Sequence, residues 1–138
     1  MDRFGQGALA ALPDMAPGFF MRAYFLLTLF LAGQAAAAGD PKNGAALFQR
    51  CASCHAVGPY ASAGYGPQLN AIVGRRSAST RDYKYSEAMK KSGLVWDEKT
   101  LAAFLRAPHD VVPGTSMRFW GIKDEQQLAD LLSYMKKF

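Results

Sequence analysis

The pattern of apolar and polar residues separates an apolar N-terminal run from a longer part with helical periodicity. After Arg22, the ten residues from Ala23 to Ala32 are almost purely apolar, and a run of four alanines follows at 35–38. A positive start, an apolar run of this length and small residues after it are typical of a secretory signal peptide. The run is short for a permanent anchor, because a membrane span needs about 20 apolar residues. We therefore expect residues 1–38 to be a leader and signal peptide, cleaved after Ala38.

Two points about this leader stay open. Cleavage after Ala37 fits nearly as well, and a signal that is not cleaved would anchor the protein in the membrane, facing the periplasm. Residues 1–20 contain Pro13 and Pro17 and have no clear period, so Met1 and Met21 are both candidate start sites.

The remaining residues, 39–138, show short helices whose starts are marked by capping side chains. The first is expected from Pro41, at the first helical position after Asp40, into Cys51. The last has leucines at 128, 131 and 132 and a methionine at 135, which is the spacing of one helix face. The four expected N-cap residues are Asp40, Ser86, Asp97 and Asp124.

Long loops connect these helices. The stretches 58–81 and 111–122 contain Gly and Pro and show no helical period, and no strand of convincing length is present. Loops this long are unusual in a compact domain that has nothing to wrap around. The pattern predicts an all-α domain of three to five short helices and long loops around an internal group.

Charge adds one feature to this picture. The 138 residues include 16 Lys and Arg against 11 Asp and Glu, a net charge of +5. Residues 1–38 contain two basic and two acidic residues, so the expected domain at 39–138 keeps the whole excess. A basic surface favours negatively charged partners. Because an exported protein would not meet nucleic acid, we expect protein partners instead.

The candidate chemistry lies in the sequence Cys51-Ala52-Ser53-Cys54-His55. C-x-x-C-H is the attachment pattern of haem c, in which two thiols on one helical turn bond the haem edge and the histidine binds the iron. A thioredoxin-type dithiol would need a strand and a helix around the cysteines. Half a zinc site or a small disulfide would also use two cysteines at this spacing. The chain has only these two cysteines, which excludes a disulfide-rich scaffold and any four-cysteine metal site.

A second iron ligand is expected from the loop 111–122. Met135 lies on the apolar face of the last helix and Met89 in a short helix, so both are interpreted as packing residues. Met117 lies in a loop with no period that would explain a buried apolar side chain, and its thioether could cover the second haem face. His/Met ligation leaves no open iron site and raises the reduction potential. His109 is the alternative ligand.

Taken together, these residues resemble class I cytochrome c of the mitochondrial and bacterial c2 type. The resemblance covers essentially all of 39–138, and the combination of Pro-Gly-Thr-x-Met with a tryptophan is more specific than the attachment motif. Its matching pieces are Gly44 and Phe48, Cys51 to His55, Gly66 to Leu69, Gly74 and Arg75, Tyr83 to Ala88, Gly93 to Trp96, Pro113 to Phe119, Gly121 and Ile122, and Leu131 with Tyr134.

The resemblance implies a role for each matching residue. His55 and Met117 resemble the axial ligand pair, and the carbonyl of Pro67 resembles the acceptor for the other histidine nitrogen. Phe119 resembles the aromatic residue that covers the haem edge. The resemblance implies that Tyr85 and Trp96 donate hydrogen bonds to a buried haem propionate. It also implies that Arg75 is the charge partner of this propionate and that Thr115 belongs to the same polar group.

The implied function is that of a monomeric one-electron carrier in the periplasm, not an enzyme. The resemblance points to a bc1-type complex or a dehydrogenase as donor and to a terminal oxidase or reaction centre as acceptor. A basic docking face would include Arg50, Arg118 and Lys123, although Ser116 and the pair His109–Asp110 replace lysines of the mitochondrial type. The alternatives are a peroxidase-like or gas-binding haem protein with a labile sixth ligand, and a membrane-tethered electron-transfer subunit.

Overall fold

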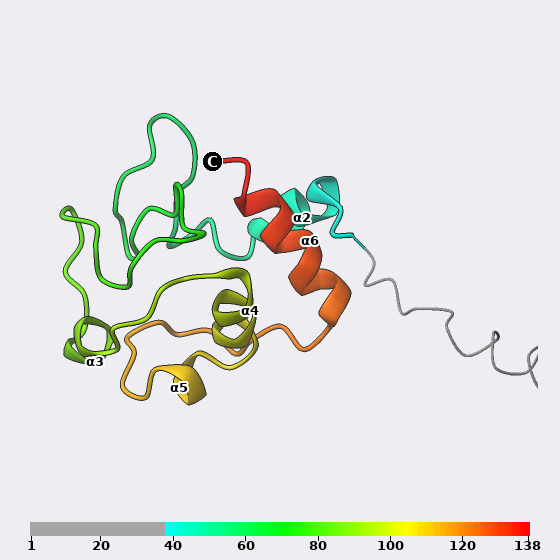
Figure 1. The fold of residues 1–138 in the computed structure, drawn as a ribbon. Helices are drawn as coiled ribbons and strands as arrows, with labels where there is room; N and C mark the ends of the chain where they lie inside the picture. Colours follow the sequence, from blue (N-terminus) through cyan, green and yellow to red (C-terminus); the bar gives the residue numbers. More distant parts are fainter. Residues whose placement is uncertain (1–37) are drawn as a thin grey trace, which may run out of the picture. The chain divides into compact units, whose positions relative to one another are not determined.

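Four of the five helices in the described part of the chain begin at the residues that the capping pattern predicts. The structure, a computed structural model, describes residues 38–138; the expected signal peptide at 1–38 lies outside these residues except for Ala38. In order along the chain, the helices are α2 (Pro41–Phe48), α3 (Glu87–Lys91), α4 (Glu98–Arg106), α5 (Pro108–Val111) and α6 (Glu125–Met135). In Figure 1, α2 and α6 lie at one end of this part of the chain, and α3 and α5 lie toward the other.

Side chains at all four expected N-caps accept hydrogen bonds from backbone N–H groups of their helices. Asp40 accepts from Lys42, and Asp97 from Thr100. Such caps satisfy N–H groups that have no partner within the helix. The other two pairs are Ser86 with Met89 and Asp124 with Gln127.

Two boundaries differ from the sequence-based expectation. The first helix ends at Phe48, because the amides of Gln49, Arg50 and Cys51 bond carbonyls three residues earlier and tighten the chain into turns. The stretch expected as loop from Val111 begins with the end of a four-residue helix, α5, which has no side-chain cap. Within residues 38–138 there is no β-strand, only one isolated antiparallel bridge between Arg76 and Val95.

The two ends of the domain sequence meet where α2 crosses α6. A Cβ atom on Gly44 would lie 2.0 Å from the backbone oxygen of Asp130, so only glycine allows the two backbones this close. The rings of Phe48 and Tyr134 pack with their centroids 5.4 Å apart. This crossing fixes the end of α2, and the attachment motif follows directly after it.

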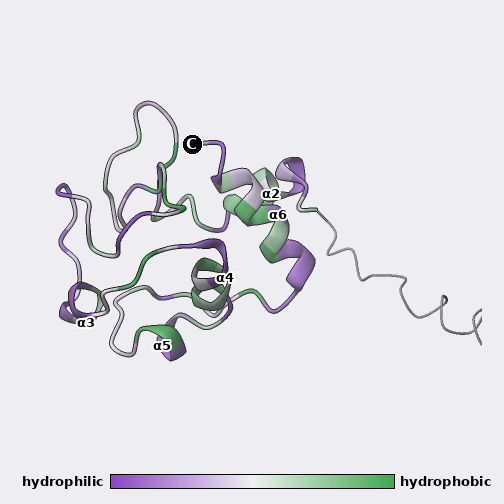
Figure 2. Ribbon diagram, in the orientation of Figure 1, coloured by the Kyte–Doolittle hydropathy of each residue, from purple (hydrophilic) through white to green (hydrophobic). Residues whose placement is uncertain are grey.

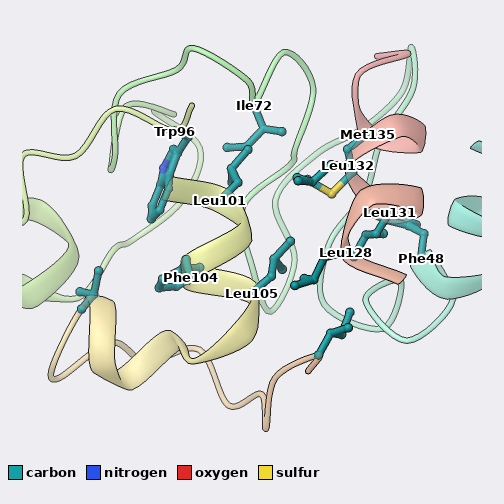
Figure 3. Packing of buried hydrophobic residues seen from close by; sticks show 12 residues of the cluster. Phe48, Ile72, Trp96, Leu101, Phe104, Leu105, Leu128, Leu131, Leu132 and Met135 are labelled. Carbon is teal, nitrogen blue, oxygen red and sulfur yellow. The ribbon is translucent and has the colours of Figure 1, made fainter. Parts of the chain in front are cut away.

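The hydrophobic core joins α6 to α4 and to the loops. Figure 2 shows the hydrophilic first turn of α6 in purple and its apolar middle in green. In Figure 3, Leu105 of α4 and Leu128 of α6 point toward each other. No helix in the described part of the chain is long and apolar enough to cross a membrane. The buried apolar residues are Phe48, Ile72, Trp96, Leu101, Phe104, Leu105, Val112, Ile122, Leu128, Leu131, Leu132 and Met135.

A buried carboxylate on α6 ties down the start of α2. Asp130 is 4% exposed, and its Oδ1 accepts hydrogen bonds from the backbone N–H of Asp40 at 2.7 Å and from Nε2 of Gln126 at 2.8 Å. These bonds favour the charged form and lower the pKa of Asp130, the bond from Asp40 having the largest effect.

The charge on Asp130 is therefore expected to stabilise the fold only above the normal pKa of an aspartate. Because the folded pKa lies below the unfolded value of about 3.9, this stabilisation is complete above about pH 4 and is lost as pH falls through the folded pKa. Asp130→Asn should lower the Tm at pH 7 by several degrees, and the difference from wild type should disappear in acid. Asp110→Asn, at an exposed position, is the control. A Tm difference for Asp130→Asn that stays constant down to pH 2 would contradict this role.

Candidate functional site

A cavity of about 370 Å³ lies between two segments of the chain that are far apart in sequence. One segment, here called the histidine wall, contains Arg50–His55 and the loop at 65–67; the other, the methionine wall, is residues 115–119. Met89 and Phe104 line the cavity between the walls. Eight of the ten expected cofactor-binding residues line it: Cys51, Cys54, His55, Pro67, Tyr85, Thr115, Met117 and Phe119.

The ring of His55 is held in one orientation by the backbone. Its Nδ1 lies 2.8 Å from the carbonyl oxygen of Pro67, which can only accept, so Nδ1 carries the proton and donates. Burial lowers the pKa of His55, and the bond to Pro67 opposes that effect in part. The imidazole is therefore neutral at pH 7, and the lone pair of Nε2 is free to bind a metal.

Glycine at position 66 lets the chain pass against this ring. A Cβ atom on Gly66 would lie 2.4 Å from Cε1 of His55 and 2.7 Å from its Nδ1. The amide of Gly66 also donates to the carbonyl of Cys54 at 2.8 Å, which ties the loop to the attachment motif. The sequence pattern indicates no separate role for Gly66; the only signal is its position directly before Pro67.

We expect Gly66→Ala to displace the His55 ring and to destabilise the haem-loaded protein by about 1–3 kcal/mol, as overpacking of a tight site does. Urea unfolding followed by circular dichroism and haem absorbance measures the loss. Gly64→Ala is the matched control, because a Cβ there has its nearest neighbour at 3.7 Å. Equal stability of the two variants would contradict the close contact.

The two cysteines lie on a single turn directly before His55. The amides of Cys54 and His55 both donate to the carbonyl of Cys51, at 3.0 and 2.9 Å. Both thiols are free and both residues line the cavity. Burial raises the pKa of Cys51, opposite to the lowered pKa of a thioredoxin-type dithiol. Two thiols and an imidazole on one turn match the geometry of covalent haem attachment.

The methionine wall brings a thioether to the same cavity. Met117 is half-buried, and its amide donates to Oγ1 of the buried Thr115 at 3.3 Å. Phe119 is also half-buried in the cavity lining. The alternative ligand, His109, is exposed on α5 and does not line the cavity, whereas Met135 belongs to the core. Met89, interpreted from sequence as a packing residue, lines the cavity from α3.

Arg75 and Trp96, the other two residues expected near a propionate, do not line the cavity. Arg75 donates from its two terminal nitrogens to the backbone carbonyls of Gln68 and Asn70, each at 2.8 Å, and so braces the loop after Pro67. Trp96 is 6% exposed in the core, where its ring packs on Phe104 with centroids 5.0 Å apart. Figure 3 shows its indole nitrogen on the side of the ring away from Leu101.

Basic residues stand at the edge of the cavity. Arg50 and Arg118 line it, and the guanidinium carbon of Arg50 lies 5.9 Å from the centroid of the Phe119 ring. A cation at this distance from an aromatic ring is attracted to it, so this contact links the two walls. Lys123, the third expected basic residue, does not line the cavity, and its Nζ donates to the carbonyl of Arg106.

The donor set fits a haem c better than a bare metal ion. No group of three His, Cys, Asp or Glu side chains that could hold a metal ion occurs among residues 38–138. The cavity instead combines one imidazole, the thioethers of Met117 and Met89 and two free thiols with the apolar rings of Phe104 and Phe119. A flat apolar group with two axial iron positions and two sites for thiol attachment matches this arrangement.

Comparisons with known proteins agree with a haem c in this cavity. The sequence matches the cytochrome c family over residues 41–138. It is 47% identical to cytochrome c2 of Rhodomicrobium vannielii, over 78% of this chain and 86% of that protein. It is 45% identical to cytochrome c-554 of Methylosinus trichosporium, over 78% of this chain and 81% of that protein. The structure of cytochrome cH from Methylobacterium extorquens is similar, with a TM-score of 0.68 and 38% identity over 72% of this chain and all of that one.

Proposed function

Because this chain belongs to the cytochrome c family, as a class I member of the c2 type, we propose that it carries single electrons between membrane redox complexes, with His55 and Met117 as the iron ligands. The family brings one covalently bound haem c, and the all-α fold agrees with it. Cys51 and Cys54 are the attachment residues in this proposal. The observation that carries it is that His55 and Met117 line one cavity from separate segments of the chain.

The residues of the cavity fit this task. When bound, the haem supplies an iron that is reversibly oxidised and reduced by one electron. His55 offers Nε2 in a fixed orientation, since its Nδ1 is held by Pro67. With Met117 as the other ligand, no iron position is open for a substrate. Tyr85 and Thr115 add hydroxyl groups to the lining, and Phe119 adds an apolar ring.

The proposal extends to partners and location. The donor would be a bc1-type complex or a dehydrogenase, and the acceptor a terminal oxidase or a reaction centre. The net charge of +5 and the cavity-edge residues Arg50 and Arg118 support docking to acidic faces, with Lys123 nearby in sequence. The protein would act as a monomer in the periplasm. Its export, with cleavage after Ala38, rests on the apolar run at 23–32 and the alanines at 35–38.

Electron transfer with native membranes tests this function. The oxidised protein is mixed with bacterial membranes that contain a bc1-type complex and a quinol, and its reduction is followed by absorbance. We expect a fast reaction that slows steeply as the salt concentration rises, because opposite charges steer the encounter. Inhibition of the bc1-type complex is the control. A protein that is reduced no faster with membranes than without them would contradict the carrier function.

A further inference from the structure

Three aromatic side chains of the described domain are left almost wholly in solvent, and the most exposed of them is Trp120. Trp120 is 99% exposed, directly after Phe119 of the methionine wall. Tryptophan is highly buried on average in folded proteins, because its large apolar surface is costly to hydrate. A scattered exposed apolar residue needs no explanation by itself, so the surroundings of Trp120 decide whether this exposure has a role.

The backbone on both sides of Trp120 is fixed in a way that keeps the indole outside. Gly121 has φ = +91°, and a Cβ there would lie 2.1 Å from the backbone oxygen of Arg106. Ile122 is 3% exposed, and its amide donates to the carbonyl of Leu105 at 2.9 Å. On the other side, Phe119 is held in the cavity lining. Turning the indole inward would pull these neighbours out of place, so its exposure follows from the fold.

Two arginines stand close to the segment that holds Trp120. Arg118 is exposed, and the guanidinium of Arg50 lies against the ring of Phe119. The two nearest carboxylates in sequence are already engaged: Asp124 caps α6, and Glu125 pairs with Arg106 at 2.6 Å. Trp120 is therefore an apolar group beside the cavity edge, next to cations whose charge is not neutralised by these carboxylates.

We propose that Trp120 is the apolar anchor of the docking face for the redox partner, a protein surface with an apolar patch rimmed by carboxylates. This inference rests on the proposed carrier function. Interfaces between proteins are commonly built around a few desolvated aromatic anchors, among which tryptophan is enriched. Charges at the rim mainly set the rate of encounter, whereas buried anchors set how long the complex lasts.

The test separates these two contributions by kinetics. We measure how fast bacterial membranes that contain a bc1-type complex and a quinol reduce each oxidised variant. The variants are Trp120→Ala, Trp120→Phe and Arg118→Gln. We expect Trp120→Ala to raise the half-saturating protein concentration about 30-fold, the size at which a hot spot is counted, while the salt dependence stays as in wild type. Trp120→Phe should give a half-saturating concentration between those of wild type and Trp120→Ala. Arg118→Gln should reduce the salt dependence instead.

Tyr60→Ala is the matched control, because Tyr60 is 96% exposed and does not line the cavity. Figure 1 shows the loop at 58–64, in green, well apart from the gold and orange segment at 112–122. Reduction by ascorbate and the urea midpoint should be unchanged in Trp120→Ala, which shows that the haem site and the fold are intact.

The outcomes distinguish this inference from the function on which it rests. If wild type reacts fast with membranes and Trp120→Ala has the same half-saturating concentration as Tyr60→Ala, the proposed role of Trp120 is overturned and the carrier function stands. If wild type itself does not react with membranes, both are overturned. Sedimentation that shows a wild-type dimer and a Trp120→Ala monomer would also overturn the anchor, because a second copy of the chain would then cover the indole.

Discussion

Replacing Met117 by alanine is expected to leave the haem attached but to lower its reduction potential by about 0.1–0.3 V, within the ~0.8 V over which axial ligands tune haem iron. The thioether of Met117 lines the cavity from a loop, and alanine carries no sulfur that could replace it. Loss of this ligand removes the stabilisation of ferrous iron and opens one iron position. The weak near-infrared iron–sulfur band of the oxidised protein should vanish, and carbon monoxide should bind the reduced protein.

Met89→Ala is the matched control for this result. Met89 is the other methionine that lines the cavity, and it lies on α3 instead of the methionine wall. Its replacement should keep the iron–sulfur band. A band that persists in Met117→Ala and vanishes in Met89→Ala would assign the ligand to Met89. A high-spin spectrum in wild type would favour the peroxidase-like or gas-binding alternative over the carrier function.

The double replacement of Cys51 and Cys54 by alanine is expected to abolish covalent haem attachment. Both thiols are free in the structure and lie on the turn that leads to His55. Without the sulfurs no thioether can form, so acidified organic solvent should extract essentially all of the haem. Denaturing gels stained for haem should lose the protein band.

Ser53→Ala controls for disturbance of the turn. Ser53 is exposed between the two cysteines, and its Oγ lies 3.8 Å from Sγ of Cys54. This variant should keep its haem through the extraction. Each single cysteine variant should retain haem through the remaining thioether, with a shifted absorption spectrum. Haem that stays with the protein after extraction of the double variant would contradict attachment through these residues.

The helices could be predicted because their starts depend on local chemistry. A short polar side chain before an apolar period satisfies free N–H groups, and Asp40, Ser86, Asp97 and Asp124 all cap as expected. The α5 helix could not be predicted, since four residues without a side-chain cap leave no period to detect. Its position depends on packing against α4, which is a tertiary contact.

The lining of the candidate site was predictable in its motif residues and in several residues that the family resemblance adds. The spacing of Cys51, Cys54 and His55 indicates haem attachment, and the loop position of Met117 suggests a ligand. The contribution of Gly66 depends on its close approach to the ring of His55, and that of Phe104 on how α4 reaches the cavity, and the sequence shows neither. The loop-bracing bonds of Arg75 depend in the same way on how 68–70 folds back.

The two walls of the cavity differ in how firmly hydrogen bonds hold them. On the histidine wall, backbone bonds join Cys54 and His55 to Cys51, and Gly66 to Cys54. Among residues 38–138, the amides at 116–121 form a single hydrogen bond, the 3.3 Å bond from Met117 to Thr115. Regions with few backbone bonds open at the lowest free energy cost, ahead of global unfolding. Of the two walls, the methionine wall is therefore expected to open first, while the histidine wall is still folded.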